Sequence, residues 1–429
     1  MSYRPFYDFW MIQRAQWKTP HEIERIQEAK LARLIRQAWN KVPYYRELMA
    51  GAGLKPEDIR SRADLRMIPI TTKRTLQSLA LKDKIAAGTD IDRCRISYTS
   101  GTTGTPLEIY AAPSDATRMN LSWGRAYLAN GMKPWYKIAA FIGQARAIRR
   151  KSWYEHWGIW RRHEISTWKD PEAWIKDIQR NKPDVLVGYV MTLKLLAEAI
   201  QAKGVQDVRP KRIFHSSALL DDPSRRFLES VFQAPVIDFY GADEAGCIAW
   251  ECPRCSSYHV NSDLVIVETT KRGETTRPGE EGEILVTNLQ SSTMPFIRYA
   301  LGDIGTLSAK ISLCGRGLPL MERIQGRIDD FIVLPNKRKI SPHPLYHCLD
   351  PVPGIRRWRI IQTDVHHLVV ELEGGRAFSS DTISRARANL VQLLKNEIEI
   401  IVRIVPSIPV PPQTKFRAIQ SELSKDLFL

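Results

Sequence analysis

The stretch Tyr98-Thr99-Ser100-Gly101-Thr102-Thr103-Gly104-Thr105-Pro106 is the most informative part of this chain. Residues 94–98 before it and 107–110 after it have the composition of short strands. Glycines at 101 and 104 permit left-handed backbone dihedrals and let a large anion approach the backbone. The stretch therefore predicts a phosphate-binding loop between two strands. Its predicted ligand residues are Thr99, Ser100, Gly101, Thr102, Thr103 and Gly104.

This loop differs from a Walker-type phosphate loop, because no lysine lies inside it and no Gly-Lys-Ser/Thr follows it. The alternative is a surface turn, since serine, threonine and glycine are common in turns. Motifs elsewhere in the chain are needed to distinguish the phosphate-binding loop from the surface turn.

The composition describes a globular protein of more than one domain. The chain has 429 residues, 43% hydrophobic and 26% charged, and no apolar run long enough to cross a bilayer. The N-terminal residues lack the apolar region of a signal peptide, so we expect a cytoplasmic protein that does not enter a membrane. The net charge of +16 favours anionic partners such as nucleotides, coenzyme A, an acidic carrier protein or nucleic acid.

The most basic run is 146–151, and tryptophans are interleaved with basic residues through position 174. Basic and aromatic residues together can bind nucleic acid. We favour the alternative, a solvated helix face whose tryptophans are packed, and do not expect nucleic acid as a partner.

Three kinds of pattern follow one another along the chain. Residues 1–80 have helical spacing of apolar positions, beginning at Pro20. Strand-like runs at 137–142, 185–188 and 212–215 alternate with helical runs at 192–202 and 224–232. Such alternation predicts an α/β fold with a mostly parallel sheet covered by helices, with ligands beyond the carboxyl ends of the strands.

Residues 260–325 have a β pattern, and about a hundred residues after 326 alternate again on their own. We therefore expect a large N-terminal domain over 1–326, with a helical lead-in over 1–80, and a small α+β C-terminal domain over 327–429.

Four further motifs follow the loop in order: DFYGADE at 238–244, RYALGD at 298–303, GRIDD at 326–330 and PPQTKFR at 411–417. Together with the loop they resemble the motifs of the adenylate-forming, acyl-CoA synthetase superfamily. Length, the helical N-terminus and the small C-terminal domain look most like the phenylacetate–CoA ligase branch, including its capsule-biosynthesis-like relatives. The resemblance runs from about residue 42 to Lys415.

The resemblance implies an enzyme that activates a carboxylic acid with ATP and Mg²⁺, releases pyrophosphate, and passes the acyl group to a thiol, most often that of coenzyme A. An aromatic acid is favoured by the resemblance alone. It also implies a mobile small domain that acts as a lid, and it allows a homodimer. The loop at 98–106 would hold the departing phosphates, by positioning them and neutralising their charge.

The resemblance also implies roles for individual residues. Tyr240 would stack on adenine, Asp238 would lie near the adenine edge, and Glu244 would ligate Mg²⁺. Position 243 is aspartate where the family usually has threonine. The predicted nucleotide-binding set is completed by Ser217, Ala218, Phe239, Gly241 and Asp243.

The last three motifs supply the remaining roles. Asp303 would accept hydrogen bonds from both ribose hydroxyls. Arg327 would contact ribose or phosphate beside a hinge on which the small domain turns. Lys415 would stabilise the pentavalent transition state, on a loop where Thr414 replaces the usual glycine. Taken singly, these residues also have ordinary structural interpretations. Tyr240 could be a core aromatic, Asp303 part of a turn, and Lys415 a surface lysine.

Cys252, Cys255 and His259 form a compact set, and Cys314 follows later. A Cys-x2-Cys turn, a histidine and a distant cysteine can complete a structural Zn²⁺ site. Some members of the resembled family carry a similar set, with a second cysteine where this chain has Ser312. Cys247 is an alternative ligand to Cys255. The other interpretation is buried free thiols beside a packed histidine.

Three rival functions stay open. The acyl group could go to a carrier-protein thiol or to an amine in place of coenzyme A. The chain could be a degenerate relative that binds nucleotide without turnover, given the replacements at 243 and 414. Nucleic-acid binding by 146–174 is the third.

Overall fold

A computed structural model of the chain describes residues 4–99, 106–142, 153–167, 169–216, 219–327, 330–340, 342–350, 352–375, 377–409 and 417–423. The chain forms two compact units, each made of two separate stretches. Unit 1 comprises residues 1–131 and 239–324, and unit 2 comprises residues 132–238 and 325–429.

Helices fill the first part of unit 1, as the sequence predicts. The long helix starts at Pro20 because Thr19 and Glu22 form a reciprocal capping box. Its buried face, which includes Leu31 and Ile35, contributes to the hydrophobic core of the unit. The helices are α1 (Arg4–Ala15), α2 (Pro20–Lys41), α3 (Pro43–Gly51), α4 (Lys73–Ser78), α5 (Leu81–Lys84) and α6 (Pro113–Ala129), with 3-10 turns at Pro56–Asp58, Arg62–Met67 and Ile91–Arg93.

The second part of unit 1 is β-rich. Its strands follow the spatial order β11-β10-β12-β13-β14-β9-β8-β7, and the pairings within β10–β13 and β7–β9 are antiparallel. The β pattern expected over 260–325 is therefore confirmed. The strands are β7 (Val236–Ala242), β8 (Gly246–Cys252), β9 (Ser257–Val260), β10 (Val265–Lys271), β11 (Glu274–Thr275), β12 (Glu281–Asn288), β13 (Tyr299–Leu307) and β14 (Leu320–Arg327).

The two strands expected around the glycine loop are present. They are β1 (Arg95–Tyr98) and β2 (Glu108–Ala111), which pair antiparallel with Tyr98 opposite Glu108. β2 is buried over its last three residues, whereas β1 is largely exposed. The hairpin is therefore attached to the core of unit 1 through β2.

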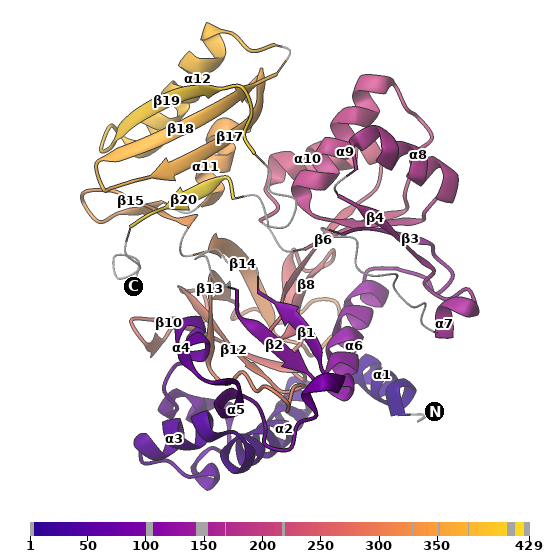
Figure 1. The fold of residues 1–429 in the computed structure, drawn as a ribbon, viewed down its shortest axis with the longest axis vertical. Coiled ribbons are helices and arrows are strands. Elements are labelled where there is room, and N and C mark those ends of the chain that lie inside the picture. Colours follow the sequence, from indigo (N-terminus) through magenta and orange to yellow (C-terminus); the bar gives the residue numbers. More distant parts are fainter. Residues whose placement is uncertain are drawn as a thin grey trace. The chain divides into compact units, whose positions relative to one another are not determined.

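The first stretch of unit 2 is the parallel α/β layer that the alternation predicts. The order is β6-β5-β3-β4, and each neighbouring pair is parallel. α8, α9 and α10 pack side by side, and their apolar faces share one core with these strands (Figure 1). The elements are β3 (Ile138–Ile142), α7 (Trp153–His156), β4 (Arg162–Ser166), α8 (Pro171–Asn181), β5 (Val185–Gly188), α9 (Val190–Lys203), β6 (Arg212–Ser216) and α10 (Asp222–Phe232).

The second stretch of unit 2 is an α+β lobe with its own core. The sheet order is β19-β18-β17-β20, with a central antiparallel pair and a parallel strand on each side. α11 and α12 complete a core that includes Leu345, Leu390 and Val370. The elements are β15 (Ile332–Val333), β16 (Lys339–Ile340), α11 (Pro342–Leu349), β17 (Ile355–Gln362), β18 (His367–Gly374), α12 (Ser380–Leu394), β19 (Glu399–Val405) and β20 (Ile419–Ser421).

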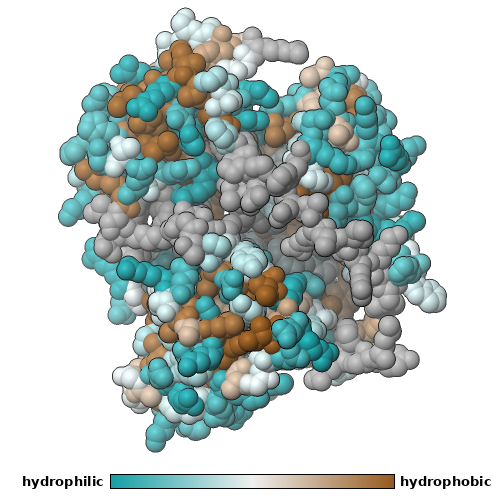
Figure 2. All heavy atoms as spheres, viewed as in Figure 1, coloured by the Kyte–Doolittle hydropathy of each residue, from teal (hydrophilic) through white to brown (hydrophobic). Residues whose placement is uncertain are grey.

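The surface is mostly polar on the face drawn in Figure 2, where hydrophobic side chains gather in separate patches. Among the described helices, none combines the length and the apolar content needed to cross a membrane.

Candidate functional site

The base of the glycine loop is closed by one residue pair. The Thr99 N–H donates to the Leu107 carbonyl at 3.0 Å, and the Leu107 N–H donates to Thr99 Oγ1, also at 3.0 Å. This pair extends the β1–β2 ladder by one step and fixes where the loop leaves the hairpin. The predicted ligands Ser100, Gly101, Thr102, Thr103 and Gly104 lie outside the described residues.

Two predicted nucleotide ligands from different motifs lie together in unit 1. The Tyr240 hydroxyl donates to Asp303 Oδ2 at 2.8 Å, although 63 residues separate them in the sequence. Tyr240 lies on β7 and is buried, whereas Asp303 lies on β13 and is half-buried. One oxygen of Asp303 is thus held by a neutral donor, which orients the carboxylate.

The chain turns tightly after Tyr240. A Cβ added to Gly241 would lie 2.6 Å from the Gly246 carbonyl oxygen and 2.6 Å from Trp123, so glycine is the residue that fits this position. The turn between β7 and β8 carries Asp243, which is exposed, and Glu244, which is 7% exposed. The predicted metal ligand therefore sits on a short turn between two strands. Phe239, next to Tyr240, is buried against Trp123 and Tyr127.

In unit 2, polar groups lie at the carboxyl ends of neighbouring parallel strands, as the fold predicts. Gly188 of β5 is opposite His215 of β6, and the buried His215 ring contacts the Gly188 carbonyl through Nδ1 at 3.2 Å. Asp238 is buried on β7, and Arg327 is half-buried at the end of β14. The predicted Ser217 and Ala218 lie outside the described residues.

The last two motifs meet in the C-terminal lobe. Arg417 Nε donates to Asp330 Oδ1 at 2.9 Å, and Arg417 Nη2 contacts the same oxygen. Both side chains are about one-fifth exposed. This pair ties the start of the lobe to the chain just after position 415. Lys415 and Thr414 lie outside the described residues.

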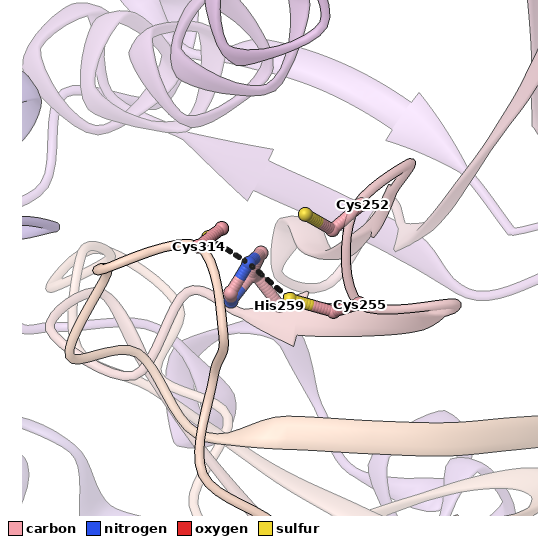
Figure 3. Close-up of side chains that lie close together, drawn as sticks. All are labelled: Cys252, Cys255, His259 and Cys314. Carbon is pink, nitrogen blue, oxygen red and sulfur yellow. Dashed lines mark hydrogen bonds between the residues drawn. The ribbon is translucent and has the colours of Figure 1, made fainter.

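The predicted metal-binding residues converge in unit 1 (Figure 3). The ligand atoms of Cys252, Cys255, His259 and Cys314 all lie within 4.8 Å of one another. His259 Nε2 lies 3.2 Å from Cys314 Sγ and 3.9 Å from Cys255 Sγ. Cys252 is the last residue of β8 and Cys255 lies in the turn that follows, whereas His259 lies on β9 and Cys314 comes from the segment before β14. Three sulfurs and one imidazole nitrogen at these separations match the donor set of a structural Zn²⁺ site.

The alternative ligand Cys247 is not in this group. It is fully buried on β8, and its thiol points to the Ala249 carbonyl at 3.6 Å. Ser312, in contrast, lies at the edge of the cluster, with Oγ 3.2 Å from Cys314 Sγ and 3.6 Å from Cys255 Sγ. The structure therefore favours the set with Cys255.

Burial and the neighbouring Arg316 shift the pKa values of this cluster. Burial, helped by the nearby Arg316 guanidinium, lowers the pKa of His259 to about 4, so the imidazole is neutral at pH 7. Burial opposes the Cys314 thiolate, but hydrogen bonds with Ser312 and Arg316 outweigh it and lower the pKa of that thiol. Burial raises the pKa of Cys252, so a bound metal ion would have to displace the proton of this thiol.

The helix face expected for the tryptophan-rich segment is wrong for residues 162–166, which form β4 and pair with β3. The tryptophans of this segment include both packed and exposed members. Trp174 is buried, packs edge-on against Phe141, and donates from Nε1 to the Ser166 carbonyl at 2.9 Å. Trp157 is 80% exposed. The basic run at 146–151 and Trp168 lie outside the described residues, so the nucleic-acid prediction is not addressed there.

Sequence reasoning missed the residues that support the Glu244 turn. Asn288 Nδ2 donates to the Glu244 carbonyl at 2.8 Å, and Gln290 Nε2 donates to the Ala245 carbonyl at 3.3 Å. Both side chains are buried. The available signal was the polar run 288–293 directly after an apolar strand, which also describes an ordinary loop.

Comparisons with known proteins agree with this architecture. The family model of the CapK C-terminal domain matches residues 332–422. The phenylacetate–coenzyme A ligase of Thermus thermophilus is 25% identical over 345 residues, covering 75% of this chain and 74% of that protein. The Escherichia coli enzyme of the same name is 26% identical over 328 residues, with 73% of each chain covered.

The fold also matches a solved structure. The 2-hydroxyisobutyryl-CoA ligase in the postadenylation state, in complex with R3-HIB-AMP, aligns with a TM-score of 0.80 and 18% identity. The alignment covers 97% of this chain and 92% of that one. The identity is low, so this match concerns the fold.

Proposed function

We propose that this chain, which belongs to the adenylate-forming superfamily in the phenylacetate–CoA ligase branch, is an ATP-dependent, AMP-forming acid–thiol ligase. It activates a carboxylic acid, aromatic by resemblance to its relatives, and transfers the acyl group to coenzyme A. In this proposal, a large domain over 1–326 and a lid domain over 327–429 both contribute to catalysis.

The observation that carries the proposal is the hydrogen bond between Tyr240 and Asp303. The resemblance assigns Tyr240 to adenine and Asp303 to ribose, which are joined in one nucleoside, and their side chains are in contact. Glu244 follows on the same segment and is buried. Coincidence is a poor explanation for contact between two motifs so far apart in sequence.

In the first step, a carboxylate oxygen of the acid attacks the α-phosphorus of ATP. A bond forms between that oxygen and phosphorus, the α–β phosphoanhydride bond breaks, and pyrophosphate leaves. Tyr240, Asp303 and Arg327 hold the nucleoside, and the 99–104 loop holds the β- and γ-phosphates with its N–H groups and hydroxyls. Lys415 places its ammonium group beside the pentavalent phosphorus.

Magnesium, when bound, neutralises phosphate charge during this transfer. Glu244 suits the ion because Mg²⁺ is held by one or two carboxylates together with phosphate oxygens and water. The turn of Glu244 is fixed by Asn288, so the carboxylate starts from a defined backbone position.

In the second step, the thiol of coenzyme A releases its proton to solvent, and its sulfur attacks the acyl carbonyl carbon. A thioester forms, the carbon–oxygen bond to phosphate breaks, and AMP leaves with the electron pair. The hinge at 326–330 turns the lid domain between the two steps, and the Asp330–Arg417 pair keeps the start and end of that lid together.

The cysteine and histidine cluster is a structural Zn²⁺ site in this proposal. Bound zinc would tie the β8–β9 turn to the segment before β14, through Cys252, Cys255, His259 and Cys314. No step of the reaction passes through it.

The decisive experiment is ATP–pyrophosphate exchange with the full chain across a panel of aryl, alkyl and amino acids. The proposal expects exchange that depends on one class of acid and on Mg²⁺. No exchange with any acid, together with retained ATP binding, would instead identify a degenerate nucleotide-binding relative.

The acceptor is tested with the acid that supports exchange. Coenzyme A, a phosphopantetheine-bearing carrier protein and hydroxylamine are offered in parallel, and the products are separated. Faster AMP formation with coenzyme A supports the proposal, whereas a preference for the carrier protein or for the amine would replace it.

Lys415→Ala separates binding from chemistry. We expect the variant to lose pyrophosphate exchange while its affinity for ATP changes little, because the lysine acts on the transition state. Near wild-type exchange would reject Lys415 as the catalytic cation.

A further inference from the structure

Asp115 is a fully buried carboxylate in unit 1, at the third position of α6. Its Oδ2 accepts hydrogen bonds from the Ser292 and Thr293 N–H groups, both at 2.8 Å, and from Thr293 Oγ1 at 2.7 Å. Arg118, one turn later, forms an ion pair with Oδ1. A buried charge is tolerated when it is paired and hydrogen-bonded to this extent, so Asp115 is a fixed point of the unit.

The same helix holds the loop after β12 at a second place. Arg118 Nε donates to the Gln290 carbonyl at 2.9 Å. The Gln290 N–H in turn donates to Asn288 Oδ1 at 2.8 Å. Residues 290, 292 and 293 are therefore held by α6 through Asp115 and its neighbour Arg118.

The last residue of β12, where this loop begins, reaches the backbone of the predicted metal ligand. Asn288 donates through Nδ2 to the Glu244 carbonyl at 2.8 Å while its Oδ1 is held by the Gln290 N–H. Gln290 Nε2 adds a contact to the Ala245 carbonyl at 3.3 Å. An unbroken series of hydrogen bonds thus joins Asp115 to the backbone of Glu244.

The loop also reaches the glycine-rich hairpin. Thr293 Oγ1, which donates to Asp115, accepts from the Ala112 N–H at 3.2 Å. Ala112 directly follows β2, the strand that leaves the glycine loop. Asp115 is thereby connected to the two elements that, in the proposed function, bind the phosphates and the magnesium ion.

We propose that Asp115 is a positioning residue that sets the Glu244 turn relative to the phosphate-binding hairpin, so that both can bind one Mg²⁺–ATP. This inference rests on the proposed function. To bind one Mg²⁺–ATP, the metal-binding carboxylate and the phosphate-binding hairpin must lie at defined distances from each other. Substitution of a residue that orients a metal ligand typically changes metal affinity by about 10-fold to 100-fold. A carboxylate that merely anchored a loop would affect stability and leave magnesium dependence unchanged.

Two near-isosteric substitutions test this inference. Asp115→Asn keeps one acceptor oxygen but removes the charge opposite Arg118. Asn288→Asp keeps the acceptor for the Gln290 N–H but removes the donor to the Glu244 carbonyl. Because they interrupt one series of contacts, their effects should not add in the double variant.

Asp263→Asn is the matched control. Asp263 is also buried and also paired with a buried arginine, Arg125, at 2.8 and 3.0 Å. Among the described residues, the Asp263 carboxylate has no hydrogen bond to residues 288–293. Loss of a buried charge pair should destabilise this variant about as much as Asp115→Asn.

The measurement is ATP affinity by calorimetry on the full chain, over a range of free Mg²⁺ concentrations, with thermal unfolding of each variant alongside. We expect the Mg²⁺ concentration for half-maximal tightening of ATP binding to rise about tenfold in Asp115→Asn and in Asn288→Asp, and no further in the double variant. In Asp263→Asn it should stay at the wild-type value while the unfolding temperature falls.

The possible results distinguish a failure of the positioning role of Asp115 from a failure of the proposed function. A wild-type magnesium response in folded Asp115→Asn, or an equal shift in Asp263→Asn, would overturn the role of Asp115 alone. If Asp115→Asn does not fold, the Asn288→Asp variant provides the test. A wild-type magnesium response in Asn288→Asp would then overturn the role of Asp115. A wild-type chain whose ATP binding ignores magnesium would overturn the proposed function together with this inference.

Discussion

The contact between Tyr240 and Asp303 allows a direct test of the nucleotide site. Tyr240→Phe keeps the ring that would stack on adenine and removes only the hydroxyl that holds Asp303 Oδ2 at 2.8 Å. A hydrogen bond to a charged group contributes about 1.5–3 kcal/mol when it is desolvated. Asp303 is half-buried, so water competes and we take about 1 kcal/mol, which corresponds to roughly a fivefold loss of ATP affinity.

The assay is ATP–pyrophosphate exchange at saturating acid, with the KM for ATP as the readout. We expect KM to rise about fivefold and the maximal rate to change little, because the lost contact orients the ground state as well as the transition state. Tyr44→Phe is the control, since the buried Tyr44 hydroxyl also makes a hydrogen bond in unit 1, at 3.1 Å to Thr71 Oγ1. An unchanged KM in Tyr240→Phe would refute the orienting role, and a lower KM would mean that the hydroxyl competes with ribose for Asp303.

Three further substitutions test separate parts of the molecule. Gly241→Ala should lower the free energy of unfolding by about 2 kcal/mol in urea titration, because its Cβ would lie 2.6 Å from a backbone oxygen and from Trp123; Gly51→Ala, in open space on α3, should be nearly neutral. Cys314→Ser should remove near-equimolar zinc from the purified protein, whereas Cys348→Ser, outside the cluster, should retain it; absence of zinc from the wild type would reject the metal site. Arg417→Gln should slow pyrophosphate exchange several-fold more than it weakens ATP binding, because the Asp330 pair anchors the chain next to position 415; equal effects would contradict that role.

Local pattern predicted the elements on which the site is built. The composition of residues 94–98 and 107–110 predicted two short strands around the glycine loop, and β1 and β2 flank that loop in register. Alternation predicted the parallel arrangement of β3, β5 and β6, since short apolar runs between helical segments leave few other arrangements, whereas β4 lies in a stretch that was expected to be helical. These predictions succeeded because each depends on residues close together in the sequence.

The long-range contacts could not be predicted in this way. Asp115 reads in the sequence as an acidic residue in the first turn of a helix, where it needs no distant partner. Its actual partners, Ser292 and Thr293, lie 177 and 178 residues away. The choice between Cys255 and Cys247 was open for the same reason: it depends on which face of β8 and its following turn meets Cys314, and spacing alone does not give that orientation.

Precise placement of a metal ligand is hardest where the ligand sits on a turn, because a short turn has few contacts of its own. Glu244 lies between β7 and β8 on such a turn, and its backbone carbonyl is held by a side chain from β12. That side chain is held by a loop that α6 fixes through one buried carboxylate. The helix therefore fixes the backbone position of the Glu244 turn. Substitution of Asp115 should change the magnesium dependence of ATP binding more than it changes the maximal rate of the enzyme.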